Sequence, residues 1–140
     1  MRYDTYNEQP PQFLRNYRAA LYIRLSREDG DKPESDSVIN QRRILENFVA
    51  SQPDIEIADY YVDDGYSGAT FDRPAFLQMM ADIYAGKISC VIVKDSSRFG
   101  RNASESGRLI GDVFPVLDVR YIAVNDLIDS GKSQSVAIDF

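Results

Sequence analysis

The chain alternates between short apolar runs of strand length and longer stretches whose apolar residues recur at helical spacing. Side chains alternate across a strand, whereas a spacing of three and four residues gathers them on one face of a helix. The apolar runs predict strands at residues 18–25, 55–62, 88–94 and 119–124. The helical spacings predict helices from 38 to about 50, between Asp72 and Gly86, and near 104–117.

This alternation predicts an α/β fold with three layers, α/β/α, and a central, mainly parallel sheet of four to five strands. A length of 140 residues suits one domain. We expect that domain to span residues 18–130, after a flexible polar tail at 1–17 and before a short C-terminal end at 131–140. The last 15 residues show no clear element.

The helices carry recognisable start and stop signals. Ser35, Asp36 and Ser37 offer N-caps for the first helix, and Asp72 with Pro74 opens the second. Pro115 should bend or end the third. The side chains expected to face the sheet are Val38, Leu45 and Val49, with Ile44 and Phe48 beside them; then Phe76, Leu77, Met80, Ile83 and Tyr84; then Leu109, Val113 and Val116.

The composition excludes several kinds of chemistry. The chain has no histidine, which excludes Ser-His-Asp and Cys-His hydrolase mechanisms. The single cysteine, Cys90, lies in an apolar run, so we interpret it as a buried strand residue and expect no metal site. No apolar run approaches the roughly 18 residues that cross a membrane, and no secretory signal is evident, so we expect a cytoplasmic protein.

Charge is unevenly distributed along the chain. The net charge of −6 argues, by itself, against nucleic acid as a partner. Residues 87–108, however, hold five basic residues against two acidic ones, a local charge of +3. This segment could bind phosphate, although an acidic domain would need a basic partner domain to bind DNA tightly.

Candidate functional residues follow the strands, where ligands gather in parallel sheets. Ser26 follows the first strand, with Arg24 two residues before it, and Arg98 and Arg101 lie in the loop after the third strand. Arg73 opens the second helix. Guanidinium groups can clamp phosphate oxygens bidentately and stabilise the charge of a phosphoryl transition state, so this set suits attack of a serine hydroxyl on a phosphodiester.

Four segments together resemble the resolvase/invertase family of serine recombinases, and within it the large serine recombinases of transposon and phage type. They are Tyr22-Ile23-Arg24-Leu25-Ser26, Ser37-Val38-Ile39-Asn40-Gln41-Arg42, Asp63-Asp64-Gly65-Tyr66-Ser67-Gly68 running to Phe71-Asp72-Arg73-Pro74, and Ser97-Arg98-Phe99-Gly100-Arg101-Asn102. The resemblance covers about residues 18–130, and the four segments occur in family order.

The resemblance implies a site-specific recombinase in which Ser26 forms a covalent 5′-phosphoserine with double-stranded DNA, as in integration or excision of a mobile element. Arg24, Arg73, Arg98 and Arg101 would hold the phosphate, and Gln41 and Asp64 would position groups or move protons. Tyr22, Lys94 and Asn102 are predicted to contact the substrate. No metal or other cofactor is implied. The implied partners are DNA and further copies of the protein, as a dimer and a synaptic tetramer.

Two departures from the family pattern accompany this resemblance. Ser97 stands where small resolvases carry an aspartate, and Asp95 could substitute for it only if the loop folds back. The family also continues into a long dimerisation helix and DNA-binding domains, so we expect this chain to be a piece truncated before them.

Two other functions remain compatible with the sequence. A non-catalytic receiver-like module would also alternate strands and helices and would use Asp63, Asp64 and Lys94, but it would leave the arginines unexplained. A recombinase-like domain without activity could serve only in regulation or assembly.

Overall fold

Five strands form one sheet in the order β2-β1-β3-β4-β5 in the computed structural model, which describes residues 16–25, 37–64, 73–100 and 102–131. The central strand β1 (Tyr17–Leu25) pairs in parallel with β2 (Ile55–Asp64) and with β3 (Cys90–Val93). Next to β3 lies β4 (Arg120–Ala123), also parallel, and the short β5 (Ile128–Asp129) is antiparallel to it at the edge. The predicted mainly parallel sheet is therefore confirmed.

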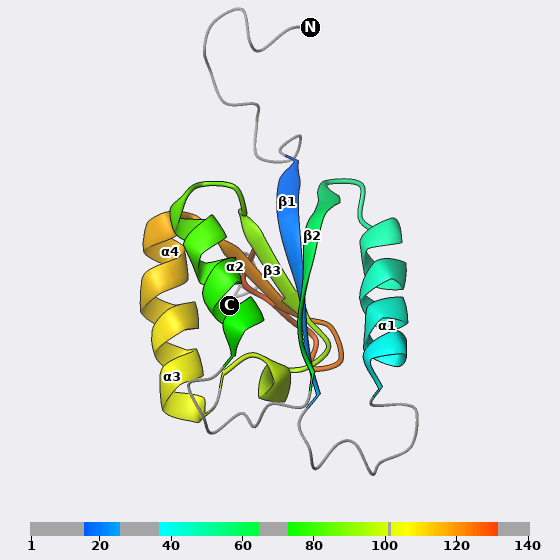
Figure 1. The fold of residues 1–140 in the computed structure, drawn as a ribbon. Coiled ribbons are helices and arrows are strands. Elements are labelled where there is room, and N and C mark those ends of the chain that lie inside the picture. Colours follow the sequence, from blue (N-terminus) through cyan, green and yellow to red (C-terminus); the bar gives the residue numbers. More distant parts are fainter. Residues whose placement is uncertain (1–15, 26–36, 65–72, 101, 132–140) are drawn as a thin grey trace, which may run out of the picture.

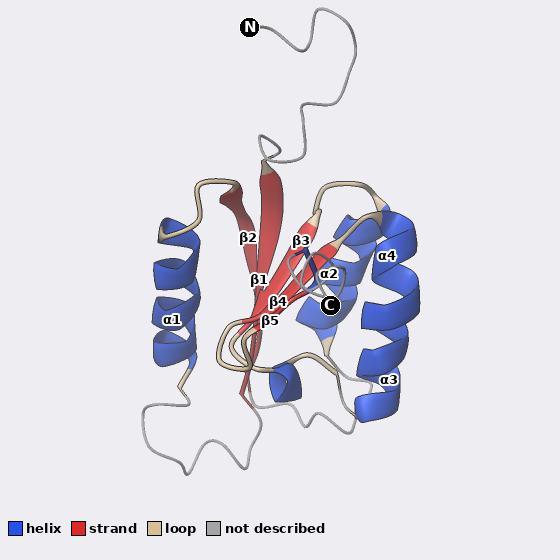
Figure 2. Ribbon diagram, turned by 180° about the vertical axis from the view of Figure 1, so that it is seen from behind, coloured by secondary structure: helices blue, strands red, loops and turns tan. Residues whose placement is uncertain are grey.

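Helices cover both faces of this sheet (Figure 1, Figure 2). On one face lies α1 (Val38–Ala50). The other face carries α2 (Pro74–Tyr84) and a longer helical stretch that begins with α3 (Ala103–Arg108) and ends with α4 (Phe114–Leu117). Because each face buries its own apolar cluster, the sheet is apolar on both sides, as parallel sheets commonly are.

Ser37 sets the start of α1, as predicted from its side chain. Its hydroxyl accepts a hydrogen bond from the Asn40 backbone N–H at 3.0 Å. Leu45 and Val49 pack against the sheet, again as predicted. The remaining buried residue of this helix is the polar Gln41, at the end where the strands finish.

The start of α2 is linked to the end of β2. The strand predicted at 55–62 continues through Asp63 and Asp64. The Asp63 carboxylate accepts hydrogen bonds from the backbone N–H groups of Ala75 and Phe76 at 2.9 and 3.0 Å. The strand end thus caps α2 from a distance. Asp72 lies outside the described residues, so the cap predicted from it is not tested.

The apolar face of α2 was also only partly predicted. Phe76 and Ile83 are buried, but Leu77 and Tyr84 are exposed and Met79 is buried in their place. Several apolar residues in this helix allow more than one choice of face, and the tilt of the helix on the sheet decides between them.

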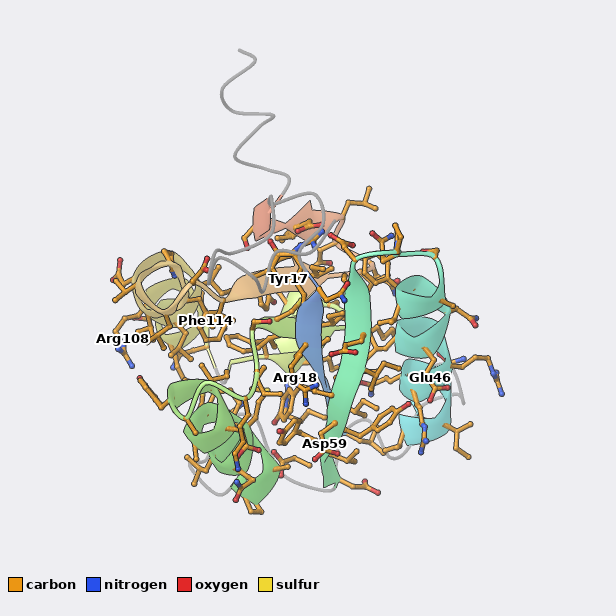
Figure 3. All side chains as sticks on the ribbon, turned by 90° about the horizontal axis from the view of Figure 1, so that it is seen from above. Tyr17, Arg18, Glu46, Asp59, Arg108 and Phe114 are labelled. Carbon is orange, nitrogen blue, oxygen red and sulfur yellow. The ribbon has the colours of Figure 1, made fainter. Side chains whose placement is uncertain are left out.

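A π-helical segment, η6 (Leu109–Val113), interrupts the third predicted helix between α3 and α4. The Phe114 backbone N–H bonds to the Leu109 carbonyl, five residues earlier. Leu109 and Phe114 are both buried as a result, whereas the predicted Val116 is 83% exposed. Figure 3 shows Phe114 turned toward the sheet and Arg108 turned away from it.

The amino ends of the strands are joined by one arginine. Arg120 of β4 bonds to both carboxylate oxygens of Asp129 in β5, at 2.9 and 2.7 Å, and to Asp54 before β2 at 3.1 Å. Its guanidinium also lies over the Tyr17 ring at 4.9 Å. These contacts hold β5 in place. The expectation of no element in the last 15 residues was therefore wrong, and it failed because a two-residue strand is too short to show an alternating pattern in the sequence.

Among the described residues, no helix is long and apolar enough to cross a membrane.

Candidate active site

The carboxyl ends of β1, β2 and β3 bring together a group of buried polar side chains that the sequence analysis had singled out. They are Arg24, Gln41, Arg73, Lys94 and Arg98, each at most 9% exposed. Arg24 is the next-to-last residue of β1. Ser26 and Arg101 lie outside the described residues, so the structure tests neither of their positions.

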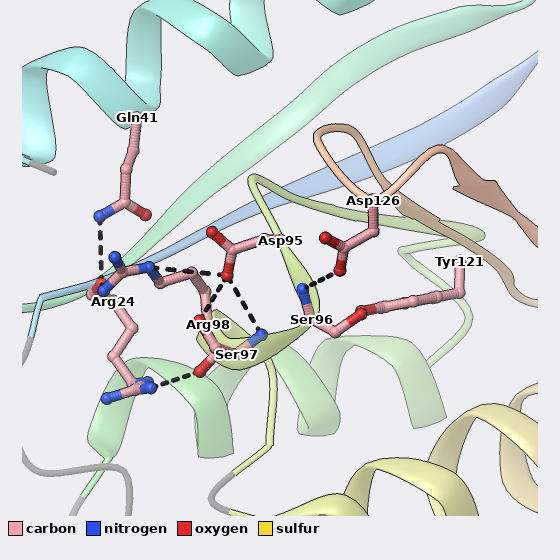
Figure 4. Close-up of polar contacts among 8 residues, drawn as sticks. All are labelled: Arg24, Gln41, Asp95, Ser96, Ser97, Arg98, Tyr121 and Asp126. Atoms are coloured by element: carbon pink, nitrogen blue, oxygen red, sulfur yellow. Dashed lines mark hydrogen bonds and ion pairs between the residues drawn. The ribbon is translucent and has the colours of Figure 1, made fainter. Parts of the chain in front are cut away.

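The backbone carbonyl of Arg24 is the meeting point of two of these side chains (Figure 4). Gln41 Nε2 donates to it at 3.1 Å from α1, and Arg98 Nη1 donates to it at 3.2 Å from the loop after β3. Segments that lie 17 and 74 residues away along the chain are therefore fixed on the backbone two residues before Ser26.

The loop after β3 folds into a short 3-10 turn, η5 (Ser96–Arg98). Asp95 caps this turn by accepting hydrogen bonds from the backbone N–H and the hydroxyl of Ser97, and it lies 3.9 Å from Arg98 Nε. The Arg24 guanidinium donates to the Ser97 carbonyl. The loop thus does fold back, and Asp95 and Ser97 sit together beside the arginine pair (Figure 4).

A second contact anchors the same turn to β4 and the segment after it. The Ser96 backbone N–H donates to Asp126 Oδ2 at 2.8 Å, and the Tyr121 hydroxyl contacts the Ser96 hydroxyl at 3.5 Å. Neither Asp126 nor Tyr121 was expected at the site, because no motif or spacing in the sequence links them to this loop.

Arg73 reaches the group from the start of α2. Its Nη1 donates to the Phe99 carbonyl at 2.7 Å, and its Nη2 pairs with Glu105 of α3 at 3.1 Å. The guanidinium stacks on the Phe76 ring at 4.0 Å. Arg73 therefore ties α2 to the turn that carries Arg98 and to α3.

Tyr22 and the two aspartates at the end of β2 have different surroundings. Tyr22 is fully buried and donates from its hydroxyl to Asp63 Oδ2 at 2.8 Å. Burial, together with this bond, raises the pKa of Tyr22. Asp63 is buried as well, whereas Asp64, the residue that the motif matched, is exposed at the end of the strand. No role in the recombinase site was predicted for Asp63 itself.

The two remaining predicted contact residues lie on either side of the η5 loop. Lys94 follows β3 directly and is buried, while Asn102 is exposed and caps α3 by accepting the Glu105 backbone N–H at 2.8 Å. Asn102 also lines a cavity of about 590 Å³, together with Arg24, Ser96, Ser97, Gly100, Ala103, Ser106 and Ile110. The cavity lies between Arg24 and α3.

The described residues contain no group of three or more Asp, Glu or Cys side chains placed to hold a metal ion. Their chemistry is that of several guanidinium groups held in fixed directions, which suits an anion with several oxygens.

A buried arginine group at the carboxyl end of a parallel sheet is consistent with a class of enzymes that act on phosphate esters, and comparison with known proteins identifies the family. The family model described as the resolvase N-terminal domain matches residues 19–136. The chain therefore belongs to the resolvase family of serine recombinases, as the resemblance had implied.

Solved structures agree with this assignment. The N-terminal catalytic domain of TP901-1 integrase is 26% identical with a TM-score of 0.73, over 86% of this chain and 87% of that one. A resolvase family site-specific recombinase from Streptococcus pneumoniae is 31% identical with a TM-score of 0.68, over 89% and 88%.

The catalytic domain of ISC1926 TnpA, an IS607-like serine recombinase, shares the fold at 20% identity, with a TM-score of 0.63 over 76% of this chain and 70% of that one. A comparison with curated proteins found no significant match. The family assignment leaves the receiver-like alternative without support.

Proposed function

We propose that this chain is the catalytic domain of a site-specific DNA recombinase that cuts and rejoins DNA through a covalent 5′-phosphoserine at Ser26. The observation that carries the proposal is the convergence of Gln41 and Arg98 on the Arg24 carbonyl, which fixes a buried guanidinium group two residues before Ser26. Such a group supplies the fixed positive charge that a phosphoryl transition state requires.

In the cleavage step the Ser26 oxygen bonds to phosphorus, the bond between phosphorus and the 3′ oxygen breaks, and the Ser26 proton is transferred in net to the 3′ oxygen. The 3′ oxygen leaves as a hydroxyl. Arg24, Arg98 and Arg101 bind the phosphate oxygens, and the covalent bond to Ser26 conserves the energy needed for rejoining by the reverse step. Neither a metal nor a nucleotide is required in this scheme.

The remaining predicted residues receive roles that follow from their contacts. Gln41 holds the backbone at the end of β1. Arg73 also binds the phosphate, and its bond to the Phe99 carbonyl holds the loop that carries Arg98. Asn102 and Asp64 are exposed at the same end of the sheet, where we expect them to contact DNA or water, and we expect the buried Lys94 to contribute positive charge there. Tyr22, which is fully buried, supports Asp63 rather than binding substrate.

The proposed partners are double-stranded DNA and further copies of the protein, first as a dimer and then as a synaptic tetramer in which strands are exchanged. The expected setting is the cytoplasm, and the reaction would integrate or excise a mobile element. Because the domain is acidic, we expect it to bind DNA weakly by itself, with an affinity that falls steeply with salt.

The test is adduct formation on a nicked suicide DNA substrate, from which the cut strand diffuses away so that the covalent intermediate accumulates. In the full-length protein, we expect Ser26→Ala to abolish the adduct and Ser51→Ala to preserve it. Ser51 is an exposed serine at the far end of α1 and serves as the matched control.

Mass spectrometry of the trapped peptide should place the phosphodiester on Ser26. An adduct of undiminished yield in Ser26→Ala, or one attached to another residue, would refute the proposed nucleophile. A wild-type protein that forms no adduct would favour the alternative of a domain that serves only in regulation or assembly.

A further inference from the structure

Arg73 has a carboxylate within hydrogen-bond distance of its guanidinium. Glu105 Oε1 lies 3.1 Å from Arg73 Nη2, and the two side chains are 19% and 3% exposed. The hydrogen bonds described for Arg24 and Arg98 instead run to backbone carbonyl oxygens. A carbonyl orients a guanidinium without cancelling its charge, whereas a carboxylate takes the place that a phosphate oxygen would take.

Glu105 belongs to a helix that is weakly attached to the rest of the domain. None of the six residues of α3 is buried. The buried anchors, Leu109 and Phe114, come only after it, in the π-helical segment and at the start of α4. Segments with few buried apolar contacts open locally at low free-energy cost.

The same helix forms one wall of the cavity beside the arginine group. Ala103 and Ser106 line the cavity on one side and Arg24 lines it on the other. A movement of α3 away from η5 would therefore widen the cavity and separate Glu105 from Arg73 in a single step.

We propose that Glu105 is an internal substitute for the DNA phosphate, which occupies Arg73 in the free domain and must be displaced when the substrate enters. This inference rests on the proposed function, since it assigns Arg73 a second state in which its partner is phosphate. Displacement of Glu105 releases α3, which pivots at η6, and the cavity opens toward Arg24. The free domain thereby keeps part of its positive charge neutralised until DNA is present.

The inference predicts a gain of activity from the loss of a buried ion pair. Glu105→Gln keeps the size and a hydrogen-bond acceptor but removes the competing charge. In the full-length protein on the nicked substrate, we expect adduct formation to become faster by about fivefold or more, the lower end of typical coupling between competing ligands. The control is Glu46→Gln, which breaks an ion pair with Arg42 on the opposite face of the sheet and should leave the rate unchanged.

A second measurement follows α3 without DNA. Hydrogen exchange of the backbone amides of Ser106, Gly107 and Arg108 should become about tenfold faster in Glu105→Gln, while those of β1 and β3 keep the wild-type rate. Adding Ser26→Ala should abolish the adduct and leave this exchange pattern unchanged.

The outcomes separate the two proposals. If Glu105→Gln slows a Ser26-dependent adduct, or leaves both its rate and the exchange of α3 unchanged, Glu105 only supports Arg73 and the inference is overturned while the proposed function stands. If no Ser26-dependent adduct forms in any variant, the proposed function fails, and the role of phosphate as a competitor of Glu105 fails with it.

Discussion

At the amino ends of the strands, Arg120 is clamped by the carboxylates of Asp129 and Asp54, whereas at the carboxyl ends Arg24 and Arg98 donate to backbone carbonyls. All three arginines are similarly buried, at 7 or 8% exposure, so burial does not distinguish them. Their partners do. Two carboxylates bind Arg120 closely and make it a structural crosslink. The hydrogen bonds described for Arg24 and Arg98 run to carbonyls, which orient a guanidinium without carrying a full negative charge, and the carboxylate of Asp95 lies 3.9 Å from Arg98 Nε.

Replacing an arginine by lysine at each end of the sheet tests this comparison. The largest effect should be on the rate of adduct formation, from the substitution at the carboxyl end. Arg98→Lys keeps the charge but loses the planar fork that reaches the Arg24 carbonyl and a phosphate together. We expect the rate of Ser26 adduct formation on the nicked substrate to fall about 100-fold, as for the loss of one transition-state donor. The melting temperature should change little, and a rate within a factor of about two of wild type would exclude the phosphate role of Arg98.

Arg120→Lys should show the opposite pattern. One ammonium group cannot reproduce the paired bonds to Asp129 together with the bond to Asp54, so we expect the free energy of unfolding in urea to fall by about 2 kcal/mol. The adduct rate per folded molecule should equal that of wild type. Unchanged stability would show that the carboxylates contribute nothing net to the fold.

Cys90, which pairs with Arg120 in the sheet, reports on the charge at the amino ends. Burial raises the pKa of the thiol from 9.0 to about 12, and nearby Arg120 opposes the rise. Above pH 9 the unfolded chain loses this proton while the folded chain keeps it. Wild-type stability should therefore fall as the pH rises from 9 to 12, by up to about 1.4 kcal/mol per pH unit from this group.

The matched variant for this experiment is Cys90→Ala, which lacks the titrating thiol. Its free energy of unfolding, measured in urea at several pH values, should decline less steeply than that of wild type over the same interval. Parallel curves would mean that the thiol titrates equally in both states, and hence that Arg120 keeps enough free charge to offset burial.

Most of the sheet and the place of the site could be predicted from the sequence, because both depend on local patterns. Apolar runs located β1 to β4, and the rule that ligands bind after parallel strands placed Arg24 and Arg98 at one end. Asp63 was missed as a cap because its partners, the backbone N–H groups of Ala75 and Phe76, lie 12 and 13 residues further along. A carboxylate that caps a distant helix leaves no local signature.

Glu105 and Asp126 were missed for a related reason. Glu105 pairs with Arg73, and Asp126 accepts a hydrogen bond from the Ser96 backbone N–H. Within its own segment, each is an ordinary charged residue. Only the packing of α3 and of the turn after β4 brings them to the site. The prediction of which side chains of the third helix face the sheet failed for a different reason, since regular helical spacing cannot anticipate a π turn at Leu109.

Because of that π turn, the number of residues in η6 determines whether the core contacts and the site residues of this helix can both keep their positions. With the i→i+5 bond, Leu109 and Phe114 meet the same core although they are five residues apart, and the helix still begins at Ala103, after its cap Asn102, beside the cavity. Deletion of a single residue from η6 would convert the segment to a regular α-helix and rotate one half against the other by roughly 100°, the step of one residue. Natural insertions and deletions in this helix should consequently avoid η6, and where one occurs, either the core contact of Phe114 or the position of Glu105 must change.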